Sequence, residues 1–427
     1  MSTFALQPWH AAALACFCLH AKADFVTDSR LDLELKNFFY DRDYHGPDAR
    51  QSRRHEWAQG VSLDFQSGWT PGTLAVGLDL SGTLGLKLDS SVAQTGSGLL
   101  PRDSSGEPES NYSSAYPTLK ARWGERHDMR LGQLSPQLPL LASNGSRLFP
   151  QRFRGFQYTG RLSKALSADA LHIDQVKLRD SSGFEDMSLT PQGGSYDGNA
   201  KSSGLDYLGL NWTISSGLGA SFHIQRLNDL MRRAYAGLKF THPVGVGEAF
   251  GELRYFDAAG EGAEKAGHVD NRTLSTLVGY RWAGHSVSGG MQRGWGDTAY
   301  AYVNGSDTYL FSEQLVSTFG NPQERALHLR YDYDFAAVGI PGLNLNVRYV
   351  KGSDIDLWGL TGVKAKRAYL AGDEGREWER TLDLTYTVQD GPLKNVYVRW
   401  RNGHYQGNFA DPADENRLTV GYKMRLW

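Results

Sequence analysis

The last part of the chain, from Asn395 to Trp427, places apolar and polar residues in strict alternation. A period of two residues predicts β-strands, because successive side chains of a strand point to opposite faces of a sheet. Such strands fit either a soluble sandwich, which buries the apolar face, or a membrane barrel, which turns that face toward lipid. In the final segment the apolar residues are Leu418, Val420, Tyr422, Met424 and Leu426, and the cationic ones are Arg417, Lys423 and Arg425.

Short alternating segments of this kind fill the chain from Asp24 onward, with Gly, Asp, Asn, Ser and Pro between them. The pattern is typical of an all-β chain, and it excludes buried parallel strands, which are apolar on both faces. About eighteen strands are predicted, an even number within the range of single-chain outer-membrane barrels. They are Ser29–Asp41, Glu56–Ser67, Thr73–Asp89, Ala115–Trp123, His127–Leu134, Arg154–Ser163, Ala168–Arg179, Gly204–Ile214, Gly217–Arg226, Arg232–His242, Gly247–Asp257, Asn271–Trp282, His285–Trp295, Glu324–Phe335, Gly342–Lys351, Trp378–Gln389, Lys394–His404 and Asn416–Trp427.

The connections between these strands alternate in length. Short turns such as Ser67–Gly72 and Asp390–Leu393 are interleaved with long loops such as Gln94–Ser114, Asp180–Ser203 and Gly296–Gln323. Outer-membrane barrels show this asymmetry, with short turns in the periplasm and long loops outside the cell. Aromatic residues gather near the predicted strand ends, as in the interfacial girdles of such barrels. We therefore predict an all-β chain that forms a transmembrane antiparallel β-barrel. The aromatic residues are Trp57, Trp123, Trp212, Trp282, Trp295, Tyr386, Trp400, Tyr422 and Trp427.

The first residues of the chain are similar to a secretory signal peptide. An apolar run from Ala11 to Leu19 is followed by Ala21-Lys22-Ala23, and small residues there are typical of a cleavage site. We predict that residues 1–23 are a signal peptide and that residues 24–427 form the barrel. Both cysteines, Cys16 and Cys18, lie in the predicted peptide, so the mature chain is expected to have no disulfide and no zinc–thiolate site. An ordinary buried helix and a lipoprotein cleavage before Cys16 are the alternatives.

The sequence carries no motif that indicates catalysis. It has no G-x-S-x-G elbow, no H-E-x-x-H and no P-loop, and no basic tract of the kind that binds nucleic acid. His172 and His223 fall in strands of mixed polarity, where they are predicted to be polar lumen or interface residues. We therefore predict no enzyme, no cofactor, no metal site and no nucleic-acid partner. A barrel enzyme, whose site a single sequence does not reveal, is the alternative.

One wall of the predicted lumen is rich in arginine. Each guanidinium can bind a carboxylate through two parallel hydrogen bonds, so a row of them offers an anion successive partners. The alternative for any single arginine is that it only solvates the inner wall. Clustering in the last third of the chain favours a path for anions. The arginines are Arg330, Arg348, Arg399, Arg401 and Arg417, all on the face opposite an apolar row.

The predicted loop Leu134–Phe153 is too apolar for a solvated surface loop. Other parts of the protein must cover it, and in a wide barrel the natural place is inside the lumen, against the inner wall, where it narrows the pore. Arg147 is then expected at the constriction. The apolar residues and prolines of this loop are Pro136, Leu138, Pro139, Leu140, Leu141, Leu148, Phe149 and Pro150.

In several of its motifs the chain resembles the OprD-type, substrate-specific outer-membrane channels of Gram-negative bacteria. The resemblance extends over nearly all of the mature chain. It implies a monomeric channel of about eighteen strands with an inward third loop, a basic ladder in the lumen and an acidic patch across the eyelet. The motifs are Glu56-Trp57-Ala58-Gln59-Gly60, Gly-Ser-Arg-Leu-Phe-Pro-Gln at Gly145–Gln151, Lys265-Ala266-Gly267, Leu329-Arg330-Tyr331-Asp332, Pro341-Gly342-Leu343, Val347-Arg348-Tyr349, Gly352-Ser353-Asp354-Ile355-Asp356 and Arg399-x-Arg401.

The same resemblance implies roles for particular residues. The third-loop arginine corresponds to Arg147, and the acidic side corresponds to Asp297 and Asp307. Some relatives carry two acids where this chain has Asn144-Gly145, which bears on how the pore accepts the cationic end of a substrate. The ladder corresponds to Arg330, Arg348, Arg399 and Arg401.

Together these observations predict a substrate-selective porin of the outer membrane. Small carboxylate-bearing solutes, such as amino acids or organic and aromatic acids, are expected to diffuse passively along the arginine ladder. The expected partners are these solutes, outer-membrane lipid and the barrel-assembly machinery. The alternative is a non-conducting barrel with a plugged lumen that acts as an enzyme or an adhesion scaffold.

Overall fold

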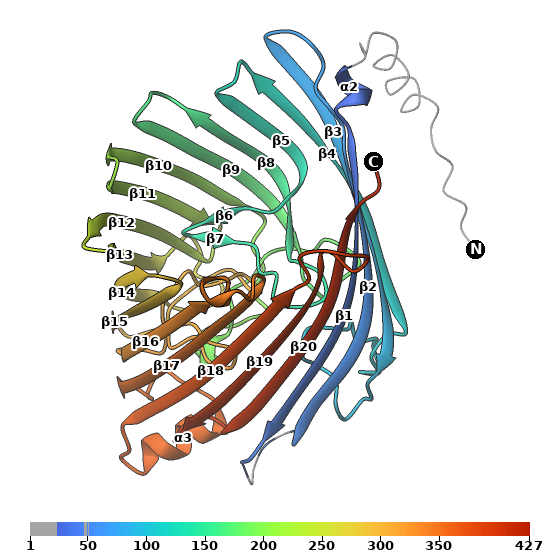
Figure 1. Ribbon diagram of the computed structural model, residues 1–427. Coiled ribbons are helices and arrows are strands. Elements are labelled where there is room, and N and C mark those ends of the chain that lie inside the picture. The colour runs from blue at the N-terminus through green and yellow to red at the C-terminus, as the bar shows by residue number, and fades with distance from the viewer. Residues whose placement is uncertain (1–23, 47–48, 50) are drawn as a thin grey trace.

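Period-two alternation along the chain produces one closed sheet (Figure 1). The computed structural model describes residues 24–46, 49 and 51–427, and in this part of the chain eighteen antiparallel strands form a barrel. The predicted fold class is confirmed. Residues 1–23, the predicted signal peptide, lie outside the described residues, so that assignment stays a prediction. The barrel strands are β1 (Arg30–Tyr44), β2 (Arg53–Gln66), β3 (Leu74–Asp89), β4 (Asn111–Trp123), β5 (His127–Leu134), β8 (Arg152–Arg161), β9 (Leu166–Lys177), β10 (Leu205–Ser215), β11 (Leu218–Leu227), β12 (Met231–Val244), β13 (Gly247–Gly260), β14 (Asp270–Trp282), β15 (His285–Trp295), β16 (Arg325–Asp334), β17 (Leu343–Ile355), β18 (Gly375–Thr387), β19 (Val396–Gly407) and β20 (Ala413–Arg425).

The barrel closes where the first strand meets the last. β1 pairs with β2 on one side and with β20 on the other, so Phe38 lies opposite both Ala58 and Thr419. In Figure 1 the blue first strands and the red last strand lie side by side at this seam. Closure pairs the backbone of every described barrel strand on both sides, which a spanning sheet requires because lipid offers no hydrogen bonds.

The two faces of each strand differ as the alternation predicts. In β20, Leu418 and Val420 are 41% and 39% exposed on the outer face, whereas Arg417 and Thr419 are only 3% and 5% exposed on the lumen side. The outer face is apolar because it contacts hydrocarbon, and the inner face is polar because it contacts water and the inward loops.

Several strands run further toward the long-loop end than the alternation predicts. β17 continues to Ile355 where the sequence predicts an end at Lys351, and β4 begins at Asn111 where it predicts Ala115. Hydrogen bonding between neighbouring strands continues above the apolar band, whereas the outward residues there are polar. The hydrophobic pattern therefore ends before the sheet does.

The short turns gather at one end of the barrel. The turn between β14 and β15 consists of Ala283 at a φ of 41° and Gly284 at a φ of 83°. Positive φ at both central residues is the geometry of a type I′ turn, whose twist matches that of the flanking strands. A Cβ at position 284 would lie 2.7 Å from the carbonyl oxygen of Asp334, so glycine is also required sterically.

The long connections lie at the opposite end. They span residues 90–110, 178–204, 296–324 and 356–374, and the last of them carries α3 (Val363–Leu370). By the rule for barrels, this end is extracellular and the short-turn end is periplasmic. The other helical turns are α2 (Asp24–Thr27), η1 (Gln192–Gly194) and η2 (Phe335–Val338). No helix among the described residues is long and apolar enough to cross a membrane.

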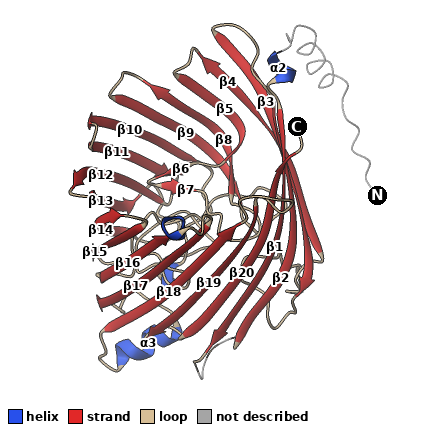
Figure 2. Ribbon diagram, viewed as in Figure 1, coloured by secondary structure: helices blue, strands red, loops and turns tan. Residues whose placement is uncertain are grey.

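Loops fill part of the barrel interior, as the tan segments in Figure 2 show. The loop between β5 and β8 carries the short hairpin of β6 (Gln137–Leu138) and β7 (Leu141–Ala142). The largest buried cluster joins residues of this loop and of the 296–324 loop to inward residues of the barrel wall. Its members include Leu140, Leu141, Tyr300 and Val303 from the loops and Leu171, Tyr207, Tyr235 and Phe256 from the strands.

Candidate functional site

The loop between β5 and β8, residues 135–151, crosses the lumen from one wall to the other. On one side Gln225 of β11 donates from Nε2 to the carbonyl of Leu140, at 3.0 Å. On the other side Lys36 of β1 donates from Nζ to the carbonyl of Leu148, at 3.1 Å. β11 and β1 lie almost opposite each other in the barrel order. The predicted inward loop is therefore confirmed, and we call it the constriction loop.

Arg147 of the constriction loop is largely buried. Its Nε donates to the carbonyl of Ser97 at 2.7 Å, and its guanidinium lies over the ring of Tyr40, 4.9 Å from the centroid. Burial, together with the neighbouring positive charge of Arg417, lowers the pKa of Arg147. Arg147 lies on the constriction loop, as the sequence predicts. Its side chain binds the 90–110 loop through the carbonyl of Ser97.

A second basic residue, Arg179, reaches the constriction loop from the 178–204 loop. Its Nη1 donates to Asn144 Oδ1 at 3.0 Å and to Ser146 Oγ at 2.7 Å. Burial lowers the pKa of Arg179, and the adjacent Asp180 partly offsets this effect. Sequence reasoning missed Arg179 because it is the last residue of the predicted strand Ala168–Arg179, whereas β9 ends at Lys177 and Arg179 belongs to the inward loop.

The 296–324 loop also folds into the lumen. Three consecutive backbone N–H groups of this loop form hydrogen bonds to one carboxylate of the barrel wall. The N–H groups of Leu315, Val316 and Ser317 donate to the carboxylate of Glu379 in β18, at 2.9, 3.1 and 2.9 Å. Glu379 is fully buried. A carboxylate that accepts several backbone donors fixes the position of the loop strongly. Sequence reasoning missed this anchor, although an acid on the lumen face of a strand is a signal that could have indicated it.

Arg417 belongs to a buried ionic network at the same place. Glu415 accepts a hydrogen bond from Tyr40 at 2.7 Å, and it binds the guanidinium groups of Arg42 and Arg417. Both arginines also donate to the carbonyl of Leu315, at 3.2 Å from Arg42 and 3.0 Å from Arg417. Arg417 is therefore a structural anchor for the 296–324 loop, and little of it faces the open lumen.

The predicted arginine ladder contains two pairs of like charges that face each other across neighbouring strands. Arg330 lies opposite Arg348 between β16 and β17, and Arg401 lies opposite Arg417 between β19 and β20. Like charges directly opposite each other on one face destabilise a sheet. The two pairs therefore concentrate positive charge on this part of the lumen wall.

Three of the ladder arginines line one groove on the inner wall. The groove has a volume of about 300 Å³ and contains Arg330, Arg348 and Arg399 together with Asp332 and Asp383. Nε and Nη2 of Arg330 each donate to Asp332 at 2.7 Å. Arg399 binds Asp383 through both of these nitrogens, with Nε at 2.9 Å from Oδ1. The groove therefore presents both signs of charge.

Arg401 differs from the other members of the ladder. It faces the lumen between Asp383 and Arg417 in the strand register. Within the described part of the chain its side chain forms no hydrogen bond and no ion pair. A guanidinium whose donors are all available can bind a carboxylate through two parallel hydrogen bonds.

Of the two acids that were predicted to lie across the pore from the arginines, only Asp307, in the middle of the 296–324 loop, lies inside the lumen. Asp307 lies against the constriction loop, where its backbone N–H donates to Ala142 at 3.0 Å. Burial and the nearby Glu313 raise the pKa of Asp307 to about 7. Glu313 accepts from the hydroxyl of Thr308 at 2.6 Å, and its backbone carbonyl lies 3.5 Å from Arg348 Nη1. The 296–324 loop thus meets the basic wall where the backbone of Glu313 lies beside Arg348.

Asp297 does not belong to this acidic side. It is exposed and lines a separate groove with Tyr255, Arg272 and Trp295. Trp295 is an outward-facing residue at the end of β15, so Asp297 lies at the outer rim. Its expected place at the eyelet is therefore corrected: the loop turns inward only after this residue.

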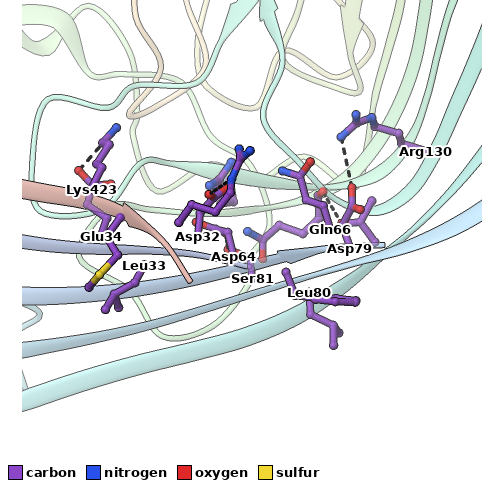
Figure 3. A pocket seen from close by; sticks show the side chains of 16 residues that line it. Asp32, Leu33, Glu34, Asp64, Gln66, Asp79, Leu80, Ser81, Arg130 and Lys423 are labelled. Atoms are coloured by element: carbon purple, nitrogen blue, oxygen red, sulfur yellow. Dashed lines mark hydrogen bonds and ion pairs between the residues drawn. The ribbon is translucent and has the colours of Figure 1, made fainter. Parts of the chain in front are cut away.

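Two wider cavities lie above and below the constriction. The extracellular one, about 1140 Å³, has the cationic residues Arg54, Arg102 and Lys364 in its lining. The periplasmic one, about 640 Å³, carries both signs of charge (Figure 3). In Figure 3 Lys423 points toward Glu34 and Arg130 points toward Asp79, with charged atoms 3.7 and 3.8 Å apart. Among the described residues no group of three or more His, Cys, Asp or Glu side chains could hold a metal ion.

Comparison with known proteins agrees with this architecture. Residues 23–426 match the family profile described as outer membrane porin, OprD family. Porin D of Pseudomonas aeruginosa is 32% identical over 425 residues, which cover 94% of this chain and 92% of that protein. The crystal structure of OccK9 (OpdG) from P. aeruginosa superposes with a TM-score of 0.87 at 37% identity, covering 94% of this chain and 100% of that one.

A structure of P. aeruginosa OpdK with vanillate superposes with a TM-score of 0.85 at 33% identity, and it covers 94% of this chain and 100% of that chain. The sequence identity is above 30% over nearly the whole length, and the structures share the closed barrel with its inward loops. The similarity therefore shows a common family as well as a common fold. Porins are channels of the outer membrane rather than enzymes. The chain therefore belongs to the OprD family of outer-membrane porins.

Proposed function

We propose that this porin admits small carboxylate-bearing solutes by passive diffusion along the inner wall of β16 to β20. The observation that carries the proposal is the pairing of arginines across neighbouring strands, Arg330 opposite Arg348 and Arg401 opposite Arg417. Arg417 has a structural role, but no internal partner of Arg401 accounts for placing a second positive charge opposite it, which is unfavourable in a sheet. An anion that moves between them relieves the repulsion at each position without being trapped at any one of them.

The charges of the pore suggest an order of events. In the extracellular cavity Lys364 is paired with Asp411, and the remaining cationic residues, among them Arg54 and Arg102, raise the local concentration of anions by long-range attraction. Arg401 then offers free donors, and the groove of Arg330, Arg348 and Arg399 receives the carboxylate beyond the constriction. The periplasmic cavity presents acids as well as bases, so the solute leaves by exchange with water and with mixed charges.

The mixed charges of the groove bear on the choice of solute. Asp332 and Asp383 stand beside the guanidinium groups of the ladder, and they can accept a hydroxyl or an ammonium group of a solute whose carboxylate binds arginine. Amino acids and hydroxylated aromatic acids have this arrangement. The vanillate in the OpdK structure is a small hydroxylated aromatic carboxylate bound by a relative, which supports this class for the present chain.

The remaining assignments follow the same reasoning. The inward loops and the wall that holds them come from one chain, which supports a channel that works as a monomer. We further propose that residues 1–23 are removed on export and that the barrel-assembly machinery inserts residues 24–427 among outer-membrane lipids, as for barrels of this kind.

Flux through purified protein in liposomes tests the proposal. Benzoate, a basic amino acid, an aliphatic acid and a neutral disaccharide would be compared, first singly and then in competition. We expect the carboxylates to pass faster than the sugar and to compete with one another. The double change Arg399→Gln and Arg401→Gln should reduce this preference while the barrel still assembles. A protein that conducts no ions in a planar bilayer would contradict the proposal and support the non-conducting alternative.

A further inference from the structure

Three cations stand close together on the outer wall, near the extracellular ends of β17 and β18. Arg376 and Arg380 alternate with the buried, inward Glu377 and Glu379, so they face away from the lumen. Lys351 of β17 is exposed on the same outer face and lies opposite Trp378 in the register. Arg376 and Arg380 flank Trp378, so each is a diagonal neighbour of Lys351 at about 7–8 Å between Cα atoms.

None of these three side chains is neutralised by the protein. Within the described part of the chain, Lys351, Arg376 and Arg380 form no side-chain hydrogen bond and no ion pair. Three like charges on one small area repel each other, and long Lys and Arg side chains at such spacing can converge on one multivalent anion. The patch is therefore complementary to a ligand with a concentrated negative charge, such as a phosphate group.

The patch also contains a row of aromatic rings. The Trp378 ring lies 5.8 Å from the Tyr349 ring and 5.2 Å from the His404 ring. Flat aromatic faces beside cations suit the sugar rings of a glycolipid headgroup, and aromatic side chains are favoured where a barrel leaves the hydrocarbon. On the neighbouring strand β16, opposite Lys351 and Tyr349, Leu327 and Leu329 are 56% and 58% exposed on the outer face, where acyl chains would lie.

We propose that this outer patch binds the phosphate-bearing headgroup of a glycolipid in the outer leaflet of the membrane. Cations and rings alternate in the strand register, with Lys351 opposite Trp378 and Arg380 opposite Tyr349, and the apolar surface of β16 adjoins them. This suits a headgroup whose phosphates and sugars lie next to its acyl chains. Basic pockets at the membrane surface recognise anionic headgroups in this way. The site lies outside the lumen and is independent of the proposed solute path.

Three other outward arginines at the same end of the barrel are paired with acids. Arg53 donates to Asp41 at 2.7 Å, Arg154 donates to Asp174 at 3.1 Å, and Arg226 donates to Asp206 at 3.2 Å. These positions therefore have no charge left for a lipid phosphate. They supply a control that removes the same number of outward positive charges from elsewhere on the rim.

Lipid binding to the full chain in detergent micelles tests the proposal. The probes are hexa-acylated lipid A with two phosphates and the same lipid after removal of both phosphates, and retained lipid is measured by native mass spectrometry. We expect the phosphorylated lipid to bind far more tightly than its counterpart. Changing Lys351, Arg376 and Arg380 together to Gln should weaken its binding roughly 100-fold, at about fivefold for each cation near the surface.

Three further measurements make the result specific. The control variant Arg53→Gln, Arg154→Gln, Arg226→Gln should bind the phosphorylated lipid nearly as the wild type does. A variant with Lys351→Arg, Arg376→Lys and Arg380→Lys keeps the charge and should keep the binding. Single-channel conductance of all variants should match the wild type, which shows that each barrel is folded.

Any of three results would overturn the proposal. One is wild-type affinity of the triple Gln variant for phosphorylated lipid A. Another is equal binding of the dephosphorylated lipid, which would show only apolar contact with the barrel. The third is an equal loss in the control variant, which would indicate a diffuse charge effect rather than a site.

Discussion

Replacing Arg401 by glutamine tests the proposed transport role of the ladder separately from its structural role. Among the described residues Arg401 has no hydrogen-bonded or ion-paired partner, and it lies opposite Arg417. The substitution therefore removes a like-charge neighbour without breaking an internal contact. We expect the free energy of unfolding to change by no more than about 0.5 kcal/mol, as for a surface position without special contacts.

The expected effect on transport follows from one lost charge-assisted contact. Hydrogen bonds to charged groups contribute roughly 1.5–3 kcal/mol, and water and salt in the lumen screen part of that energy. About 1.4 kcal/mol corresponds to a factor of ten. We therefore expect carboxylate permeability to fall about tenfold, whereas a neutral sugar of similar size should pass as before.

Arg417→Gln is the matched comparison, since it changes the same residue type on the adjoining strand. It would leave the fully buried Glu415 with Arg42 as its remaining guanidinium partner. The carbonyl of Leu315 would also lose the hydrogen bond that Arg417 donates to it. Breaking a buried ion pair in this way costs about 3–5 kcal/mol. This variant should therefore lower the unfolding midpoint and loosen the 296–324 loop, and both effects are absent from the Arg401 variant.

The assay is uptake of benzoate and of a neutral disaccharide into liposomes that contain equal amounts of folded protein. Unfolding midpoints in urea are measured on the same preparations. Raising the salt from 0.1 to 1 M shortens the screening length from about 10 to about 3 Å, so the benzoate preference of the wild type should shrink. If the Arg401 variant takes up benzoate and sugar in the wild-type ratio, the ladder is not the path of the carboxylate.

Three other predictions follow from the same structure. Val420→Arg, on the lipid face, should destabilise the barrel by about 2–4 kcal/mol in urea titrations, whereas Thr83→Arg, on the lumen face, should be tolerated; equal stability of the two would contradict the assigned faces. Deletion of residues 138–149 should raise single-channel conductance and relax solute selection, and unchanged conductance would show that the constriction loop does not narrow the pore. Burial and Glu313 raise the pKa of Asp307 to about 7, so this carboxyl is neutral below that pH and negative above it. Carboxylate flux should therefore fall as the pH rises from 6 to 8, Asp307→Asn should abolish the fall, and Asp297→Asn should preserve it.

The fold was predictable because its signal is local. A strand with lipid on one side and water on the other must alternate at every second residue, and this pattern can be read without knowing any neighbour. The same parity placed Arg330, Arg348 and Arg401 on the lumen face, and apolar character alone placed the constriction loop inside the barrel. Each of these conclusions needs only the chemistry of consecutive residues.

Only the tertiary structure shows which partner each side chain binds. Arg401 and Arg417 share a face, a charge and a strand register, yet the structure binds Arg417 to Glu415 and leaves Arg401 free. The partners come from parts of the chain far away in sequence, as when Glu379 holds the N–H groups of residues 315–317. No spacing within the sequence encodes which distant backbone reaches a given carboxylate.

The two acids of the 296–323 loop show the same limit. Asp297 and Asp307 are equivalent in sequence terms, but the loop turns into the lumen between them, so one lies at the outer rim and the other beside the constriction loop. The sequence by itself determined which residues face the pore wall and the lipid, because parity along a strand is a local property. Only the closed barrel decided which of them meet across the lumen, because that depends on how loops from opposite walls pack into one interior.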